Sequence, residues 1–505
     1  MYIPIRSKMD ETKGNNEKDK EQMLKYTLAK LSEAPQLVKN HLEEAGKTLR
    51  YRRAYFRIKK YVDEFLLGEE LGNITKRLII LPGLRGVGKT TIVYQIYDYL
   101  KNQKKIEQDR ILYFSTDELK AYMGKNILDV VDTFIQEIHK TSPVHLDKEI
   151  FVFIDEAHFD NNWSETAKVL FDKSKKIFMI FTGSSALNLE LSVDAARRTT
   201  KEIVFPMNFS EYLTLRYENW FPPKGMTESI RDLIFRGDEE LVVKHASAKE
   251  NELTKLVLAI GRPIEKEWED FVCCKGFPFS LNMSQVESHE KIFSMIDRVI
   301  EKDIFSIQSF NTETRNTISR ILTFLALQSP GGTSDSKLSS RLSISPTLIR
   351  SILDVLEKTH LIFSIKPYGG AGKIVRKAWK YYFLSPSINT AIRFKLGSYD
   401  RTNREMFGVL VENMVASYFV RMKETINLPT GIFYDSSDNG VDFILRDKEE
   451  KIIPIEVGYG KKDGGQIKKA IKKYGSKYGI LICDCPKINK ADDVIYIPIT
   501  TFSFV

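Results

Sequence analysis

The sequence predicts an α/β fold built around a parallel sheet, and three features of residues 77–205 support this prediction. Short apolar runs alternate with helical patterns, as in sheets whose parallel strands are connected by helices. The runs are almost continuously apolar, which is typical of strands buried on both faces. The first run leads into a glycine-rich loop and then a helical pattern. The expected strands are Leu78–Leu81, Arg110–Ser115, Glu149–Ile154, Lys176–Phe181 and Glu202–Phe205.

Composition sets the limits for the rest of the chain. A chain of 505 residues is expected to form about three to four domains. The formal net charge of +9 permits contact with nucleic acid, but it is mild for this length, so an ordinary basic surface is an equal interpretation. The four cysteines have neither metal-binding spacing nor the density of a disulfide framework. No apolar run approaches the ~20 residues that span a bilayer, and the N-terminus lacks a secretory signal. We therefore expect a cytoplasmic protein that does not contact a membrane.

Residues 1–50 are expected to form a charged tail and a helix. Residues 1–22 are polar and highly charged, which predicts disorder, and Met23–Glu44 has a helical pattern. The stretch Leu49–Leu67 mixes basic and aromatic residues at helical spacing. It is either an arm that touches nucleic acid or the nucleotide base, or an amphipathic helix packed on the sheet domain. We favour packing, because Lys and Arg stems can cover apolar surface.

The glycine-rich loop after the first strand has the form GxxxxGK[ST], the P-loop that binds nucleotide phosphates. Glycines let the backbone approach a phosphate, and successive N–H groups form an anion-binding nest at the start of a helix. Lys89 is expected to reach the β- and γ-phosphates of ATP, and the Thr90 hydroxyl to bind Mg²⁺. The expected nucleotide-binding residues are Gly83, Leu84, Arg85, Gly86, Val87, Gly88, Lys89, Thr90 and Thr91.

Polar residues follow two further strands of the predicted sheet. Asp155 and Glu156 end an apolar strand, and their types fit a Mg²⁺-binding carboxylate and a general base that deprotonates the attacking water. Without the P-loop, a solvated acidic turn would be an equal interpretation. Ser184 follows the next strand and is expected to sense the γ-phosphate. Because the carboxyl ends of parallel strands share one edge, these side chains should meet the P-loop there.

An arginine pair precedes the last expected strand. Arg197 or Arg198 is a candidate arginine finger, and we select Arg198 as the catalytic residue. The arginine would act either within one chain or across the interface of a homo-oligomer. A surface arginine pair is an equal interpretation.

Several motifs together resemble a known family. The segments LPGLRGVGKTT, FIDEAH with Trp163 after it, FTGSSA, ARRT and FPMNFSEYL are similar to those of AAA+-type ATPases that are common in archaea and bacteria and are related to the STAND group of signal-transducing NTPases. The resemblance implies an ATPase core, a helical lid, a winged helix and a C-terminal restriction-endonuclease-like α/β domain. The expected bounds are 51–205, 206–310, 311–400 and 401–505, after the N-terminal region 1–50.

Two segments of the expected lid resemble family motifs. Gly276-Phe277-Pro278 is similar to the GxP element with which such lids approach the base and sugar, so Pro278 is a candidate nucleotide-binding residue. An ordinary loop with Gly and Pro is an equal interpretation. Ile296–Phe305 also fits the family lid.

Residues 311–400 have the order of a helix-turn-helix with a wing. Helical patterns at Asn316–Gln328 and Ser336–Leu342 precede a third helix, which Ser345 caps. Strands are expected at Leu361–Lys366 and Lys373–Leu384. Basic residues on the third helix and the wing would neutralise DNA phosphates: Arg350, Lys373, Arg376 and Lys377. Alternatively, this module only packs against the ATPase and relays its state.

Residues 403–505 resemble the PD-(D/E)XK nuclease core. The resemblance implies that Asp442, Glu456 and the helix residue Glu412 hold Mg²⁺ or Mn²⁺. The family lysine two residues after the second acid is replaced by Gly458. Lys461 or Lys462 would have to substitute, so we expect nuclease activity to be weak or lost. The lysine-rich stretch 461–477 attracts a phosphate backbone or is a solvated helix face, and both interpretations stay open.

These features predict a Mg²⁺-dependent ATPase that acts as a conformational switch. ATP and ADP would be its ligands, and the winged helix and the basic C-terminal helix would contact DNA or another partner. Two alternatives are an ATP-regulated DNA endonuclease of a defence or mobile-element system and a nucleotide-binding scaffold without turnover.

Overall fold

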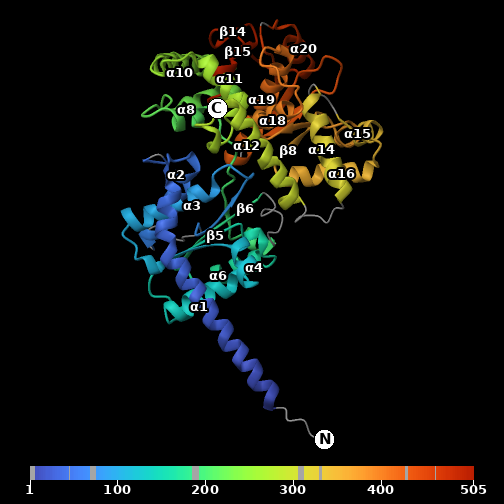
Figure 1. Ribbon diagram of the computed structural model, residues 1–505. Coiled ribbons are helices and arrows are strands. Elements are labelled where there is room, and N and C mark those ends of the chain that lie inside the picture. The colour runs from blue at the N-terminus through green and yellow to red at the C-terminus, as the bar shows by residue number, and fades with distance from the viewer. Residues whose placement is uncertain are drawn as a thin grey trace. The chain divides into compact units, whose positions relative to one another are not determined.

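The computed structural model describes residues 6–44, 46–68, 76–184, 193–304, 312–328, 333–426, 430–460 and 462–505. The chain forms two compact units, which are described separately. The first comprises residues 1–83 and 88–204, and the second comprises Leu84–Val87 and Phe205–Val505. The tip of the predicted P-loop therefore groups with the second unit. Figure 1 shows the elements of both units in chain order.

The first unit is organised around the predicted parallel sheet (Figure 1). Its five strands follow the order β4-β5-β6-β3-β7, and every pairing is parallel. Their bounds are β3 (Leu78–Pro82), β4 (Ile111–Ser115), β5 (Ile150–Asp155), β6 (Ile177–Gly183) and β7 (Thr200–Lys201). Almost every residue of the first four strands is buried, as their apolar runs predict.

The last strand is shorter and begins earlier than expected. The sequence predicts Glu202–Phe205, whereas β7 covers Thr200–Lys201. The following chain still runs beside β3, because the Glu202 amide donates to the Ile80 carbonyl over 2.9 Å and the Val204 amide to the Pro82 carbonyl over 2.9 Å.

Helices cover this sheet, and the longest of them differs from the expectation. Disorder is predicted for residues 1–22, but α1 runs from Arg6 to Leu42. Lys25 and Glu21 lie one helical turn apart and form an ion pair, and such pairs stabilise a helix. The other helices are α2 (Arg53–Leu67), α3 (Lys89–Asp98), α4 (Thr116–Met123), α5 (Ile127–Thr133), α6 (Trp163–Lys173) and α7 (Val193–Ala196), with short π or 3₁₀ segments at Tyr99–Gln103, Gln108–Arg110, Phe134–Ile138, Pro143–His145 and Ala157–Phe159, and the strand pair β1 (Glu43–Glu44) and β2 (Lys47–Thr48).

Helix α2 is the amphipathic segment for which the sequence left two roles open. Its apolar face is buried, and Phe65 lies against Phe151 of β5 and Phe178 of β6. On its polar face, Arg57 Nε and Tyr61 Oη each donate to Glu202 over 2.7 Å. These contacts support the expected packing on the sheet domain.

The second unit contains helices and one eight-stranded sheet. The helices are α8 (Phe209–Arg216), α9 (Met226–Arg236), α10 (Glu240–Leu258), α11 (Ile264–Cys274), α12 (Gln285–Arg298), α14 (Thr312–Leu327), α15 (Asp335–Leu342), α16 (Pro346–Lys358), α17 (Ala371–Arg376), α18 (Pro386–Lys395), α19 (Arg404–Ile426), α20 (Gly465–Tyr474) and α21 (Ile499–Phe502), with the 3₁₀ segment η8 (Pro278–Ser280) and the π-helical segment η9 (Val299–Ile304). The strands are β8 (Ile362–Pro367), β9 (Lys380–Phe383), β10 (Gly431–Tyr434), β11 (Phe443–Arg446), β12 (Ile452–Val457), β13 (Gly479–Cys483), β14 (Asn489–Ala491) and β15 (Val494–Pro498).

The eight strands connect two regions that the sequence predicts as separate domains. Their order is β14-β15-β13-β12-β11-β10-β8-β9. Strands β8 and β9 form the hairpin of the expected winged helix, and β8 pairs in parallel with β10 of the expected nuclease-like domain. The hairpin and the C-terminal strands therefore belong to one sheet. The predicted domain bounds themselves stay predictions.

The region of the expected winged helix contains three helices followed by a hairpin. Ser345 caps α16 as predicted, since its hydroxyl accepts a hydrogen bond from the Leu348 amide over 3.3 Å. The expected strand Lys373–Leu384 is wrong in its first half, where the chain forms the short helix α17. The Trp379 indole N–H donates to the Ile374 carbonyl over 3.1 Å and stabilises this turn, so that the strand begins only at Lys380.

Helices α8–α11 share one hydrophobic core with α19 and the C-terminal strands. The C-terminal residues are part of this core, because Trp268 Nε1 donates to Ser503 Oγ over 2.9 Å.

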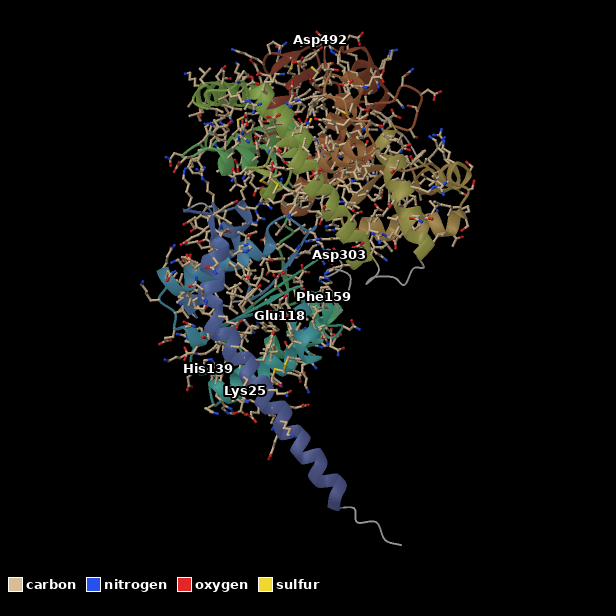
Figure 2. The ribbon with its side chains drawn as sticks, in the orientation of Figure 1. Lys25, Glu118, His139, Phe159, Asp303 and Asp492 are labelled. Carbon is tan, nitrogen blue, oxygen red and sulfur yellow. The ribbon has the colours of Figure 1, made fainter. Side chains whose placement is uncertain are left out.

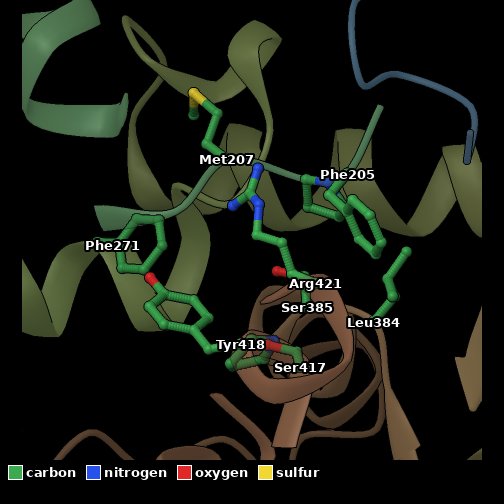
Figure 3. Close-up of a pocket in the computed structure, with 10 residues that line it drawn as sticks. Phe205, Met207, Phe271, Leu384, Ser385, Ser417, Tyr418 and Arg421 are labelled. Carbon is green, nitrogen blue, oxygen red and sulfur yellow. The ribbon is translucent and has the colours of Figure 1, made fainter. Parts of the chain in front are cut away.

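A small pocket lies at the start of the unit, beside Phe205. Figure 3 shows Arg421 extending from α19 toward the segment Phe205–Met207. Its guanidinium pairs with Glu211 over 3.2 Å and lies 5.6 Å from the Phe205 ring. Among the helices in the described ranges, none is long and apolar enough to cross a membrane.

Candidate active site

The P-loop connects β3 to α3 as the sequence predicts. Gly86 and Gly88 have φ angles of 78° and 90°, which L-residues with side chains adopt at a cost. Lys89 is buried at the first position of α3, and its ammonium donates to the Gly83 carbonyl over 2.8 Å. The lysine therefore lies across the loop. The side chain of Thr91, also a predicted ligand residue, is within 2.9 Å of His41 Nε2 of α1.

The sheet order brings the predicted Mg²⁺ ligands together. Asp155 ends β5, and its Oδ2 atom accepts a hydrogen bond of 2.7 Å from Thr90 Oγ1. The Tyr113 hydroxyl donates to the same carboxylate oxygen over 3.3 Å, and Thr182 donates to the other oxygen. A hydroxyl and a carboxylate at this distance supply the oxygen donors that Mg²⁺ prefers. The residues fit the ion.

Glu156 follows Asp155 in a left-handed backbone conformation, with a φ of 51°. Its amide donates to Thr182 Oγ1 over 3.3 Å, and its carboxylate lies 3.3 Å from Nδ1 of the buried His158. The side chain is largely buried beside the predicted Mg²⁺ ligands, which suits the predicted general base. Sequence reasoning assigned no role to His158, although the spacing in FIDEAH places it two residues after the base.

Ser184 and Arg198 differ in how well they fit their expected roles. Ser184 follows β6, the strand between β5 and β3, and its hydroxyl is buried without a hydrogen-bond partner in the described part of the chain. A ligand in the P-loop would supply the missing acceptor. Arg198 instead pairs with Asp172 of α6 over 2.6 Å and donates to the Asp194 carbonyl over 2.6 Å. Both roles stay predictions.

The sequence predicted no role for two tyrosines that lie at this edge of the sheet. Tyr94 Oη of α3 donates to Tyr113 Oη over 3.1 Å, and Tyr113 in turn contacts Asp155. Burial and the charge of Asp155 hold the pKa of Tyr113 well above its usual value, so it stays a neutral donor. A tyrosine in the middle of an apolar strand gives no local signal of this contact.

The tip of the P-loop makes its contacts within the second unit. Arg85 forms a bidentate ion pair with Asp303 of η9, with the shortest distance 2.7 Å. The Phe279 ring lies against Gly86, and a Cβ atom at Gly86 would be 2.6 Å from it. Phe279 follows Pro278 in η8. The predicted GxP element thus adjoins the loop tip, while the role of Pro278 stays a prediction.

In the C-terminal sheet, two of the three predicted metal-binding acids share one lysine. Glu412 of α19 accepts hydrogen bonds from Lys380 Nζ over 3.0 Å and from Tyr382 Oη over 2.7 Å. Lys380 lies 4.0 Å from Asp442 Oδ1, and Asp442 Oδ2 accepts from the Val457 amide over 2.9 Å. Lys380 comes from β9, so its position could not be read from the C-terminal sequence.

Glu456, the third acid, is paired with Lys462, one of the two lysines that the sequence offered as substitutes. Lys462 Nζ donates to Glu456 and to the Val457 carbonyl. Glycine at 458 makes room for it, because a Cβ atom there would be 2.6 Å from Lys462 Cδ. Lys461 lies outside the described residues.

Each of the two glutamates is largely buried and paired with a lysine. Burial and the nearby charge of Asp442 raise the pKa of both Glu412 and Glu456 to about 7. Within the described residues, no group of three or more His, Cys, Asp or Glu side chains is arranged to hold a metal. The predicted second Mg²⁺ or Mn²⁺ site is therefore not supported. The physical reason is that each glutamate already has an ammonium group beside it, the buried Lys380 at Glu412 and the more exposed Lys462 at Glu456.

Comparisons with known proteins match the sheet domain to a described family. Residues 75–213 match an AAA domain, residues 265–398 match a domain of unknown function (DUF8612), and residues 407–502 match another (DUF4143). The chain is 32% identical to the uncharacterized protein MJ1637 of Methanocaldococcus jannaschii over 479 residues, which cover 94% of this chain and 93% of that protein. It is 25% identical over 389 residues to an uncharacterized protein of Haemophilus influenzae, covering 75% and 82%.

Two solved structures show a distant likeness to this chain. The Walker-type ATPase PABY2304 of Pyrococcus abyssi has a TM-score of 0.39 at 15% identity, covering 70% of this chain and 97% of its own. The ORC2 protein of Aeropyrum pernix, in ADPNP–ADP complexes, has a TM-score of 0.34 at 13% identity, covering 71% and 98%. At these scores neither likeness bears on function.

Proposed function

Because the chain belongs to the protein family of MJ1637 and carries an AAA domain, we propose that it binds ATP with Mg²⁺ in the loop Gly83–Thr90 and hydrolyses the terminal phosphate. The observation that supports this proposal most directly is the hydrogen bond of 2.7 Å between Thr90 and Asp155. It joins the end of the P-loop to the carboxylate of a neighbouring strand.

Each residue then has a chemical task. The loop amides and the Lys89 ammonium bind the phosphate oxygens. Thr90 and Asp155 would hold Mg²⁺, which when bound neutralises charge on the phosphates. Glu156 takes a proton from water as the water oxygen bonds to the γ-phosphorus, and the bond from that phosphorus to the bridging oxygen breaks, which releases ADP. Ser184 would donate its hydroxyl to a γ-phosphate oxygen.

The test is ATP turnover by the full chain with Mg²⁺. Lys89→Ala should abolish measurable hydrolysis and weaken ATP binding, because the ammonium that faces the phosphates is removed. Lys120→Ala is the matched control, since Lys120 is an exposed lysine of α4. Equal turnover by the wild type and Lys89→Ala would refute the assignment of the site.

We further propose that the second unit changes state with the nucleotide and contacts DNA. The support is its helix-and-hairpin region, in which α16 carries the exposed Arg350. On α20, Lys468 and Lys473 are paired with Asp492 and Asp435 over 3.0 and 2.8 Å. These pairs leave the solvated-face interpretation of that helix open.

Gel-shift titration against double-stranded DNA at two salt concentrations tests DNA contact. Phosphate-driven binding should weaken steeply at the higher salt concentration, and Arg350→Ala should weaken it uniformly across sequences. Absence of a shift at low salt would refute DNA contact and favour a protein partner.

The lysine-paired acids favour loss of nuclease activity over the alternative of an ATP-regulated endonuclease. Both glutamates hold protons up to about neutral pH and contact ammonium groups. Incubation of plasmid DNA with Mn²⁺, with and without ATP, should give no cleavage. Cleavage by the wild type that Asp442→Ala abolishes would contradict this proposal.

A further inference from the structure

The four residues at the tip of the P-loop are held by packing contacts. Leu84 and Val87 are 1% and 0% exposed. Between them, Gly86 lies under the Phe279 ring, where no Cβ atom would fit without a shift. The Phe279 ring is stacked with Phe277 at 5.4 Å, so it is held in place from behind. The tip is thus packed on both sides of Arg85.

Arg85 itself is held by a carboxylate that lies 218 residues away in the sequence. Its Nε atom donates to both oxygens of Asp303 over 3.0 and 2.9 Å, and Nη2 donates to Oδ1 over 2.7 Å. The Asp303 side chain is 2% exposed, and that of Arg85 is 20% exposed. Asp303, labelled in Figure 2, belongs to η9, one turn from the end of α12.

The geometry indicates a positioning role. A bidentate arginine–carboxylate pair fixes the direction of the arginine as well as its distance. A buried carboxylate without its cation is costly, so Asp303 holds Arg85 strongly. The Arg85 amide belongs to the run of N–H groups expected to bind phosphate, and a fixed guanidinium limits where the Arg85 backbone can lie. A loop ordered before the ligand arrives loses less freedom on binding.

We propose that Asp303 is a positioning residue for the nucleotide: through Arg85 it holds the P-loop tip in the phosphate-binding shape. The proposal rests on nucleotide binding in this loop and adds its regulation. Coupling between two sites is reciprocal, so bound nucleotide must also stabilise η9. The ion pair is then the contact through which the state of the nucleotide reaches the region after α12.

The first test is the ATP dissociation constant of the full chain, measured with a fluorescent ATP analogue. Asp303→Asn and Arg85→Gln should each weaken binding roughly tenfold, within the usual range of coupling between sites. The double variant Arg85→Gln/Asp303→Asn should bind no more weakly than either single variant, since both remove the same interaction. Glu301→Gln is the matched control, because Glu301 lies in the same segment but pairs with Arg315 in an exposed position.

A second measurement separates positioning from loss of folding. In amide hydrogen exchange, saturating ATP should slow exchange in Val299–Ile304 of the wild type and of Glu301→Gln. The same saturating ATP should produce no such protection in Arg85→Gln, although this variant keeps the buried Asp303 in place. If Asp303→Asn or Arg85→Gln fails to fold, Arg85→Lys carries both measurements, because it keeps a cation beside the buried Asp303 but loses the bidentate geometry of the guanidinium.

The outcomes distinguish this proposal from the function on which it rests. If Lys89→Ala binds ATP like the wild type, nucleotide binding in this loop is refuted. If Lys89→Ala loses binding while Asp303→Asn and Arg85→Gln bind like the wild type, only the positioning role is refuted. Additive losses in the double variant, or equal protection of η9 in Arg85→Gln, would also overturn it.

Discussion

Acidic side chains meet strand ends in both units, but their partners differ. The hydrogen-bond partners that the structure gives for Asp155 are neutral donors, namely three hydroxyls and an amide. In the C-terminal sheet, the acids face Lys380 and Lys462 instead. A carboxylate without a nearby ammonium group attracts a cation, whereas one that already pairs with a lysine attracts it less. The comparison shows that carboxylates at strand ends predict a metal site only when no ammonium group occupies the metal's place.

The largest expected effect concerns the first of these regions. Glu156→Gln removes the general base but keeps its size, so we expect ATP turnover to fall about 10²- to 10⁴-fold while ATP binding persists. Steady-state hydrolysis and equilibrium binding measure the two quantities separately. Glu165→Gln, which changes an exposed acid of α6, is the control and should leave both unchanged. Full turnover by Glu156→Gln would show that Glu156 is not the general base.

In the C-terminal sheet the corresponding change should affect stability. Lys380→Met would leave Glu412 and Asp442 without their shared cation, which should cost about 3–5 kcal/mol of unfolding free energy at about pH 8, where Glu412 is ionised in the wild type. Chemical denaturation measures this loss. Lys477→Met is the control, because its pair with Asp238 is 70% exposed on the lysine side and is worth at most about 1 kcal/mol. A stable Lys380→Met variant that binds Mn²⁺ would remove the distinction between the two regions.

The two regions also differ in what the sequence could reveal. The approach of Thr90 to Asp155 follows from strand periodicity and from the common edge of parallel strands, so local patterns predict it. Lys380 lies 32 residues before Glu412 and on a strand assigned to another module, so no spacing rule links them. The pairing of β8 with β10, which brings Lys380 to the acids, is a tertiary contact that single-strand patterns do not contain. The same holds for Asp303 and Arg85.

Proton binding should reveal the lysine-paired acids directly. The folded pKa of Glu456 is about 7, above its ordinary 4.5, so the folded chain keeps a proton that the unfolded chain releases. The stabilisation is complete below about pH 4.5 and is lost as the pH rises through about 7, by at most about 1.4 kcal/mol per pH unit. Glu456→Gln should lack this loss.

The measurement is the difference in unfolding free energy between the wild type and Glu456→Gln from about pH 5 to about pH 8. The difference is needed because buried His289, whose pKa is lowered to about 4 by burial, opposes the trend at acidic pH in both proteins. A difference that stays constant with pH would mean that Glu456 is ionised throughout, as a metal-binding acid would be.

The smallest expected effect concerns the unpartnered hydroxyl of Ser184. Ser184→Ala breaks no hydrogen bond within the described residues, so the unfolding free energy without nucleotide should stay within about 0.5 kcal/mol of the wild type. If Ser184 donates to a phosphate oxygen, ATP turnover should fall about tenfold or more, because a hydrogen bond to a charged group contributes about 1.5–3 kcal/mol. Lost stability with unchanged turnover would assign Ser184 to the packing of β6. Lost turnover with unchanged stability would mean that Ser184, at the same sheet edge as Asp155, donates its hydroxyl to the nucleotide.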